Sequence, residues 1–335
     1  MAPLIHNKPI LYHMTVARYI SAIAALLTCS AFAHAQTWPS RNVRIIAPFA
    51  AGGTADLLGR ITAGKLSESL GQTFIVENRP GAGGVLGSEL VARSTPDGYT
   101  LLVSGVASHA IAPALSQKFP FDPVKDFAHI ALFGGPPCVL AVHPSLPVKD
   151  LKSFIAFAKS KPQELTYGSP GNGTQGHLVA ELFKRSAGFN IQHVPYKGAS
   201  GAVVDVVAGN THAISTTLTT ASSQIRAGRL RALAISSAAR LPEYAQVPTY
   251  REAGYPDLVA TVWFSLSAPA ALPVEIVNRL NNEVRRVLHQ PEVLSRLRPE
   301  GIEPGTLDAK AFTDFVAAEV KRWAPVVRAS GAKAD

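Results

Sequence analysis

Ile46-Ala-Pro-Phe-Ala-Ala-Gly-Gly-Thr-Ala-Asp-Leu-Leu-Gly-Arg60 is the stretch that decides the fold. An apolar strand leads into a glycine loop, and the loop leads into a helix. A second unit of this kind is Leu165-Thr-Tyr-Gly-Ser-Pro-Gly-Asn-Gly-Thr-Gln-Gly-His177. Such a loop directs several backbone N–H groups and the positive end of a helix dipole at one point, which favours an anion. Either loop alone is also compatible with an ordinary βα turn, but two together favour one acidic ligand held from two sides.

Strands and helices alternate around these units. We expect strands at residues 43–49, 73–76, 99–103, 130–133, 139–142, 165–168, 191–194, 213–216, 230–235 and 261–267. We expect helices at residues 55–70, 151–160, 174–187, 201–208, 274–288, 291–297 and 309–327, with a further helix ending at Arg93. Strands that alternate with helices of this length indicate βαβ units and parallel sheets.

The chain is expected to build two α/β lobes. It leaves the first at Gly134-Gly-Pro-Pro137 and returns with the strand at 261–267, so lobe 1 comprises residues 36–137 and 261–335 and lobe 2 comprises residues 138–260. Two crossings form a hinge, and the crevice lies at the carboxyl ends of the strands. Both glycine loops follow strands and would therefore face that crevice.

Residues 1–35 have the pattern of a cleaved secretory signal peptide. Arg18 precedes a short apolar run, and Ala33-His34-Ala35 precedes Gln36, where the mature chain would start in the periplasm. The apolar run is too short for a permanent membrane anchor. A lipoprotein signal with Cys29 as the lipidated residue is an alternative, and either Met1 or Met14 is the initiator.

Charge and cysteine content exclude some classes of function. The formal net charge is +9, and removing the leader with Lys8 and Arg18 lowers it to +7, with no run of five basic residues. A scattered surplus of this size argues against nucleic-acid binding, which needs a clustered basic face. After cleavage Cys138 is the only cysteine, so no intrachain disulfide forms, and its apolar neighbours predict a buried packing role.

No motif in the chain supports an enzyme, a metal or a cofactor. Gly171-Asn-Gly-Thr-Gln-Gly176 matches the dinucleotide fingerprint, but the acidic residue expected about 20 positions later is missing. There is no nucleophile elbow, no phosphate loop ending in Gly-Lys-Ser or Gly-Lys-Thr, and no histidine or cysteine spacing typical of a metal site. An enzyme of another kind stays open at this point.

Several residues near the loops have two interpretations. Thr54 and Thr174 are either N-caps or donors to a bound carboxylate, and Asp56 either complements the helix dipole or contacts ligand. His177 either faces the crevice or packs. Trp263 and Phe264 alternate on a strand, so one would pack in the core while the other walls the cleft.

Taken in order, the motifs resemble one family over the whole chain from Trp38 onward. They are Pro48-Phe-Ala-Ala-Gly-Gly-Thr-Ala-Asp56, Glu77-Asn-Arg-Pro-Gly-Ala-Gly-Gly84, Pro96-Asp-Gly-Tyr-Thr-Leu-Leu102, Phe121-Asp-Pro-Val-Lys-Asp-Phe127, Tyr167-Gly-Ser-Pro-Gly-Asn-Gly-Thr174 and Val194-Pro-Tyr-Lys-Gly198. This set resembles the Bug/TctC family, the extracytoplasmic solute receptors of tripartite tricarboxylate transporters. Ala51 stands where the family often has Pro, a small departure that should leave the loop's amides in place.

The resemblance implies a periplasmic-binding-protein-like fold of type II, in which two lobes close on a small carboxylate like a Venus flytrap. It implies that main-chain amides and hydroxyls of the two glycine loops hold the carboxylate, partly through water. The implied ligand contacts are Phe49, Gly52, Gly53, Thr54 and Asp56 from lobe 1, and Ser169, Gly171, Gly173, Thr174 and His177 from lobe 2. The segments Val106–Ser108 and Thr216-Thr217 would complete the walls, with Ser108, Thr216 and Trp263 as further contacts and Phe264 as an alternative to Trp263.

The expected function is that of a monomeric receptor without cofactor, which delivers the acid to the membrane subunits of the transporter. Two alternatives are open at this point. One is a periplasmic signalling adaptor that presents its closed form to a sensor or partner protein. The other is an exported enzyme on the same fold, which would turn over the bound acid.

Overall fold

A computed structural model describes residues 38–116, 118–161, 164–260 and 262–332. The predicted signal peptide and its cleavage site lie outside these ranges and stay predictions. Residues from Arg41 onward form one compact unit, which contains both lobes. Within the described ranges no helix is both long enough and apolar enough to cross a membrane.

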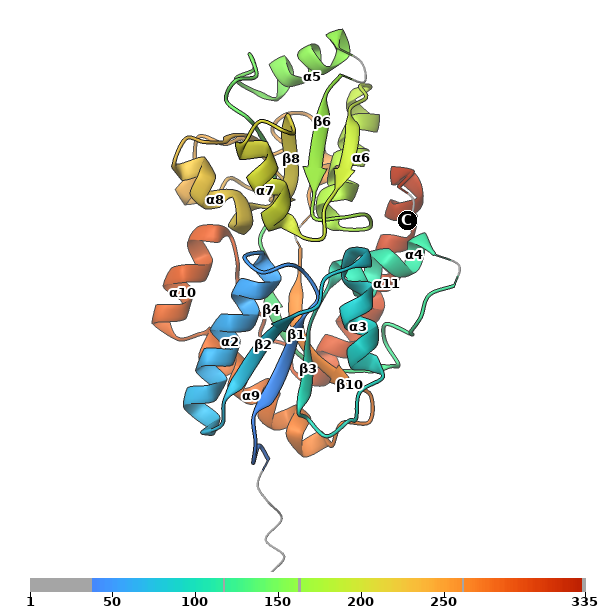
Figure 1. The fold of residues 1–335 in the computed structure, drawn as a ribbon, viewed down its shortest axis with the longest axis vertical. Coiled ribbons are helices and arrows are strands. Elements are labelled where there is room, and N and C mark those ends of the chain that lie inside the picture. Colours follow the sequence, from blue (N-terminus) through green and yellow to red (C-terminus); the bar gives the residue numbers. More distant parts are fainter. Residues whose placement is uncertain (1–37, 117, 162–163, 261, 333–335) are drawn as a thin grey trace, which may run out of the picture. The chain divides into compact units, whose positions relative to one another are not determined.

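The first lobe is built on a five-stranded sheet with the order β2-β1-β3-β10-β4 (Figure 1). Its strands are β1 (Val43–Ala47), β2 (Phe74–Asn78), β3 (Thr100–Gly105), β4 (Phe127–Gly134) and β10 (Phe264–Pro269). Its helices are α2 (Thr54–Leu70), α3 (Val85–Ala92), α4 (Ala112–Leu115), α9 (Val274–Leu288), α10 (Pro291–Leu297) and α11 (Ala309–Ser330), with short turns η2 (Ala82–Gly84), η3 (Ala107–Ile111) and η6 (Arg298–Glu300). Helix α2 packs against β2 and α9, α3 against β3, and α11 against β4.

The second lobe repeats this plan with the strand order β7-β6-β8-β5-β9. Its strands are β5 (Cys138–Val142), β6 (Thr166–Ser169), β7 (Gln192–Pro195), β8 (Ala213–Thr217) and β9 (Arg231–Ile235). Its helices are α5 (Leu151–Ser160), α6 (Gln175–Ala187), α7 (Ala199–Val207) and α8 (Leu218–Arg226), with turns η4 (Pro242–Tyr244) and η5 (Pro256–Leu258). The predicted fold class, two α/β lobes, is thereby confirmed.

Each sheet is mixed, whereas the alternation of elements predicted parallel sheets. Strand β10 is antiparallel to both β3 and β4, and β5 is antiparallel to both β8 and β9. These two strands are the first that the chain forms after each crossing between the lobes. A strand that enters a lobe from the crevice starts where the parallel strands end, so it must run in the opposite direction. The βαβ units themselves are parallel, as in β1 with β2 and β3.

The chain crosses between the lobes at two points that lie side by side. The N–H of Val262, on the return path, donates to the carbonyl of Pro136, on the outward path, at 3.1 Å. A Cβ atom on Gly135 would lie 2.1 Å from the Val262 carbonyl oxygen, so only glycine permits this approach. Thr261, the first residue of the predicted return strand, lies outside the described residues, and β10 itself begins at Phe264. The paired crossings lie where the hinge is predicted, and the exact boundaries of the lobes stay a prediction.

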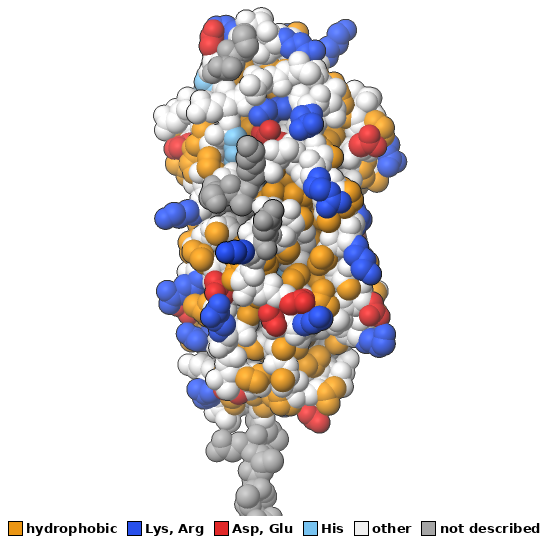
Figure 2. Space-filling view, turned by 90° about the vertical axis from the view of Figure 1, so that its right-hand side faces the viewer, with side chains coloured by type: hydrophobic (Ala, Val, Ile, Leu, Met, Phe, Trp, Pro, Cys, Tyr) orange, Lys and Arg blue, Asp and Glu red, His pale blue; other side chains and the backbone are white. Residues whose placement is uncertain are grey.

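The cores follow from apolar strands buried on both faces. In β1, Val43, Ile45 and Ile46 are fully buried between β2 and β3. Cys138 opens β5 and is also fully buried, and burial raises the pKa of its thiol to about 12. The predicted packing role of Cys138 is confirmed. On the face shown in Figure 2, Lys and Arg side chains are scattered and interleaved with acidic ones.

Two helical segments were missing from the sequence prediction. Helix α8 follows β8 directly, and the π-helical turn η3 with the short α4 follows β3 after one residue. Both follow strands without an intervening polar loop. At the start of α8, Thr217, Thr219 and Thr220 are β-branched and therefore favour strand locally. Tertiary packing overrides that preference.

Candidate ligand-binding site

A cavity lies between the two lobes and contains about 560 Å³ of space, part of it open to solvent. The residues that line it are Phe49, Gly53, Thr54, Ala55, Gly105, Val106, Ala107, Ser108, Pro170, Thr174, Gln175, Gly176, Ala199, Thr217, Val262 and Phe264. No described residue of this wall carries a charged side chain. The wall therefore combines an apolar part, to which Phe49, Val262 and Phe264 contribute, with a polar part built largely from backbone.

Four helices begin at the cavity. The first residues of α2 and α6 lie in its wall, as does Ala199 at the start of α7, and Thr217 is the N-cap of α8. The first N–H groups of a helix have no partner inside the helix, and each helix dipole adds roughly half a positive charge at this end. Helices from both lobes thus create a positive potential in a cavity whose described wall lacks Lys and Arg.

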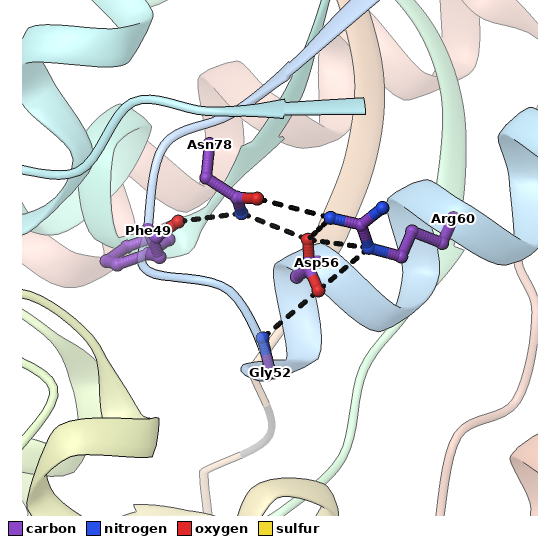
Figure 3. Close-up of polar contacts among 5 residues, drawn as sticks. All are labelled: Phe49, Gly52, Asp56, Arg60 and Asn78. Carbon is purple, nitrogen blue, oxygen red and sulfur yellow. Dashed lines mark hydrogen bonds and ion pairs between the residues drawn. The ribbon is translucent and has the colours of Figure 1, made fainter. Parts of the chain in front are cut away.

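In the first glycine loop, the carboxylate of Asp56 holds the loop together (Figure 3). It accepts hydrogen bonds from the Gly52 N–H at 3.1 Å, from Arg60 Nε at 3.0 Å and from Asn78 Nδ2 at 3.0 Å. Asn78 Nδ2 also donates to the carbonyl of Phe49 at 3.0 Å. Burial alone would raise the pKa of Asp56, but the hydrogen bonds and the guanidinium charge hold that pKa below its usual value. Asp56 thus braces the loop behind the cavity and does not belong to its wall.

The second glycine loop is tied to the start of α6. Thr174 is the N-cap: its hydroxyl accepts from the His177 N–H at 3.5 Å and donates to the Gly171 carbonyl at 2.7 Å. The Gly173 N–H donates to His177 Nδ1 at 3.3 Å. The imidazole of His177 therefore supports the loop from behind, while Thr174 lies in the wall of the cavity.

Ser169 connects this loop to a stack of rings. Its hydroxyl accepts from the Gly171 N–H at 3.1 Å and pairs with His193 Nε2 at 2.6 Å. The His193 ring is stacked on His177 with centroids 4.2 Å apart and on Tyr167 at 4.8 Å. Burial, followed by the charges of His177 and Lys184, lowers the pKa of His193 to about 3. A neutral His193 is thus kept beside Ser169 at neutral pH.

Direct hydrogen bonds join the lobes beside the cavity. The Thr54 hydroxyl on α2 donates to the Thr217 hydroxyl at 2.8 Å, and both side chains are buried. The Ala50 N–H donates to the Lys197 carbonyl at 3.3 Å. Thr54 is not the N-cap of its helix, because that position is occupied by Gly53. Its hydroxyl serves the contact between lobes.

The π-helical turn η3 places a third kind of polar group in the wall. Ser108 lines the cavity, and its hydroxyl pairs with His109 Nδ1 at 2.9 Å. His109 is fully buried, and burial, together with the nearby His129, lowers its pKa well below the usual range. Single π-helical turns are frequent at functional sites because they change the direction of one side chain.

The structure brings some of the predicted contacts to the cavity and leaves others behind it. Phe49, Gly53, Thr54, Ser108 and Thr174 line the wall. Gly52, Asp56, Ser169, Gly171, Gly173, His177, Thr216 and Trp263 do not belong to it. Trp263 Nε1 donates to Glu319 at 2.9 Å in the lobe 1 core, so its neighbour Phe264 forms the wall. Likewise Thr217 lies in the wall of the cavity, whereas the predicted contact Thr216 is fully buried beside it. A ligand role for any of these residues stays a prediction.

The sequence did not predict seven of the wall residues, which are Ala55, Gly105, Pro170, Gln175, Gly176, Ala199 and Val262. A signal for Ala199 was present: strand β7, Lys197-Gly198 and helix α7 form a third strand–glycine–helix unit, shorter than the other two. Among the described residues no group of three or more His, Cys, Asp or Glu side chains is placed to hold a metal ion.

Comparisons with known proteins show the family to which this chain belongs. The family model described as "Tripartite tricarboxylate transporter family receptor", TctC, matches residues 58–332. Protein BugT of Bordetella pertussis is 36% identical over 324 residues, covering 96% of this chain and 99% of BugT. A solved Rhodopseudomonas palustris protein with bound malate, MatC, is 33% identical with a TM-score of 0.82 over 87% of this chain and 100% of its own. A solved R. palustris protein with adipate is 36% identical with a TM-score of 0.85, covering 88% of this chain and 99% of its own.

Proposed function

Because this chain belongs to the TctC family of tripartite tricarboxylate transporter receptors, we propose that it captures a small organic carboxylate between its two lobes in the periplasm. The bound acid is then delivered to the membrane subunits of a tripartite transporter. The observation that carries this proposal is the convergence of four helix N-termini, from both lobes, on one cavity. Two solved relatives hold adipate and malate, which supports a carboxylate as the ligand class.

Binding is coupled to lobe closure because the ligand touches both lobes. A carboxylate at the start of α2 gains the N–H groups of α6 and α7 only when the lobes are together. A ligand shifts the balance between open and closed forms only by its difference in affinity for the two. The membrane subunits would then recognise the closed form. The proposed role is that of a receptor and not of an enzyme, in keeping with the receptor family to which the chain belongs.

The test compares the ligand affinity of two variants with glycine substitutions in α2, one at its N-cap and one within the helix. Gly53→Val places a branched side chain in the wall, where a Cβ atom has ordinary contact with its nearest neighbour at 3.6 Å. Gly64→Val changes an exposed position of α2 at which a Cβ atom meets no described atom within 4 Å. We expect Gly53→Val to weaken binding of malate or adipate at least tenfold, while Gly64→Val binds as the unsubstituted protein does.

Isothermal titration calorimetry and thermal shift on the purified full chain provide the readouts. An acid at one hundred times its dissociation constant should stabilise the protein by about 2.7 kcal/mol. Thr174→Ala should weaken binding as well, because it releases the loop at Gly171. Unchanged affinity in both Gly53→Val and Thr174→Ala would place the site elsewhere. Absence of binding by mono-, di- and tricarboxylates alike would contradict the receptor function.

A further inference from the structure

Gln175 is a polar residue of the cavity wall whose side chain has no role in the proposed function so far. It is the first residue of α6, it lines the cavity, and the residue is 2% exposed. Both atoms of its amide, Oε1 and Nε2, are buried and lack a hydrogen-bond partner among the described residues. As the amide is placed in the structure, therefore, neither its donor end nor its acceptor end is paired.

The hydroxyl side chains of the wall differ from Gln175 in this respect. Thr54 donates to Thr217, Thr174 donates to the Gly171 carbonyl, and Ser108 pairs with His109. These three hydroxyl groups are thus occupied by hydrogen bonds within the protein. A buried polar group without a partner costs about 1 to 3 kcal/mol, so buried amides are usually paired. Gln175 thus keeps its hydrogen-bonding capacity for something that enters the cavity.

The position of Gln175 on the helix directs its side chain towards the cavity end. The Cα–Cβ bond of every helical residue is tilted towards the helix N-terminus, and long side chains lean the same way. The N-terminus of α6 lies in the cavity wall, since Thr174, Gln175 and Gly176 all line it. A rotation about the side-chain torsions would then present the amide to a ligand.

A primary amide requires both an acceptor and a donor from its partner. A carboxylate oxygen satisfies the amide N–H, but it leaves the amide oxygen unpaired. An ammonium group would supply the donor, yet it would face the positive ends of four helices with no Asp or Glu in the described wall. A hydroxyl group is neutral and donates, so it fits the amide oxygen without this penalty.

On the basis of the proposed function, we propose that Gln175 is a specificity-determining residue, which selects carboxylates that bear a neutral hydroxyl donor beside the carboxylate. The amide N–H binds a carboxylate oxygen, and the amide oxygen accepts from the hydroxyl. Plain alkanedioates and amino acids are the classes that this arrangement disfavours.

The experiment measures the affinity of the full chain for two pairs of acids by calorimetry. Malate and succinate differ only in a hydroxyl group, as do citrate and tricarballylate. We expect the hydroxy acid of at least one pair to bind roughly tenfold more tightly, the effect of one hydrogen bond in a buried site. In Gln175→Leu both acids lose the hydrogen bond from the amide N–H, and only the hydroxy acid also loses the acceptor of its hydroxyl, so the ratio of the two affinities should fall to about one.

Gln290→Leu serves as the matched control. Gln290 is a half-buried glutamine at the N-cap of α10, it also has an unpaired Oε1 atom, and it does not line the cavity. This variant should keep the full ratio. A ratio that is equal in Gln175→Leu and the unsubstituted protein, or a preference for the plain acids, overturns the assignment but leaves the receptor function intact. If no carboxylate binds the unsubstituted chain, both proposals are wrong.

Discussion

The hydroxyl of Thr54 in lobe 1 donates a hydrogen bond of 2.8 Å to the hydroxyl of Thr217 in lobe 2. Both side chains are buried and both residues line the cavity. The start of α2 and the N-cap of α8 are thereby joined beside the proposed ligand. In the proposed closure this contact forms when the lobes come together, so its free energy should contribute to ligand affinity.

Thr54→Val removes this hydrogen bond while keeping the branched shape of the side chain. One buried hydrogen bond contributes about 1 kcal/mol, so we expect a loss of affinity of roughly fivefold, measured by calorimetry with the acid that the protein binds. Thr62→Val is the control on the same helix, because the Thr62 hydroxyl is fully buried with no described partner. Its affinity should be unchanged. Equal losses in the two variants would show that Thr54 acts through helix stability only.

Gly83 in η2 approaches the second lobe closely. A Cβ atom at this position would lie 2.6 Å from the carbonyl oxygen of Asn172, and the residue has a φ of +61°. Gly83→Ala should therefore hold the lobes apart and weaken ligand binding at least tenfold. The left-handed conformation adds a folding penalty of about 1 kcal/mol for any side chain.

Gly228→Ala separates these two effects. Gly228 has a similar φ of +70°, and a Cβ atom there meets no described atom within 4 Å. Both variants should lose about 1 kcal/mol of unfolding free energy in urea, and only Gly83→Ala should lose affinity. Full affinity in Gly83→Ala would show that the lobes tolerate a wider separation at this point.

Buried histidines make the stability of the protein depend on pH. His129 is 2% exposed, and burial lowers its pKa to about 4, although the hydrogen bond to the Pro123 carbonyl opposes this shift. The unfolded chain binds the proton near pH 6.5, whereas the folded chain binds it near pH 4. Between these values the unfolded state holds more protons, so stability rises with pH. The contribution of His129 to the stability is complete above pH 6.5 and is lost as the pH falls to 4.

We expect His129 to lower the free energy of unfolding by roughly 3 kcal/mol as the pH falls from the pKa of the unfolded chain to that of the folded chain. Urea unfolding at several pH values measures it, and His129→Gln should flatten the dependence. His193, with its pKa also lowered, adds to the same trend. An NMR titration in which the His129 ring protonates with its ordinary, unshifted pKa would contradict this prediction.

Glu319 on α11 anchors two tryptophans. Its carboxylate accepts from Trp263 Nε1 at 2.9 Å and from Trp323 Nε1 at 3.0 Å, and the residue is 6% exposed. Glu319→Leu would leave two buried indole N–H groups without an acceptor, and we expect a loss of roughly 3 kcal/mol in unfolding free energy. Glu319→Gln retains an acceptor oxygen and should recover a large part of this stability. Equal stability of the two variants would contradict the anchoring role.

Local sequence patterns correctly predicted the helices whose ends and apolar periodicity are set by residues close together in the sequence. Thr54–Leu70, Leu151–Ser160 and Val274–Leu288 were predicted within one residue at each end. Glycine loops and apolar periodicity are sufficient for such elements. The helix Leu218–Arg226 was missed because Thr217, Thr219 and Thr220 favour strand by local preference, while packing against β8 and β9 decides the outcome.

Whether each loop residue contacts ligand or supports the loop could not be predicted from the sequence. Gly52 and Asp56, or Gly173 and His177, are four residues apart, and their types suit either ligand contact or support of the loop. Only the tertiary structure shows that the carboxylate of Asp56 faces Gly52, Arg60 and Asn78, and that His177 faces Gly173. Strand direction was also decided by tertiary structure, since β5 and β10 enter their sheets from the crevice.

By itself, therefore, the sequence determined the two α/β lobes, the two crossings and the glycine loops before α2 and α6. These features depend on backbone freedom, helix dipoles and hydrophobic period, which act over a few residues. The tertiary structure decided which side chains form the wall. It joined Thr54 to Thr217 across 163 positions of sequence, and it left the Gln175 amide buried without a partner in the cavity wall. Pairing and burial arise only when distant segments pack, and so no local pattern encodes them.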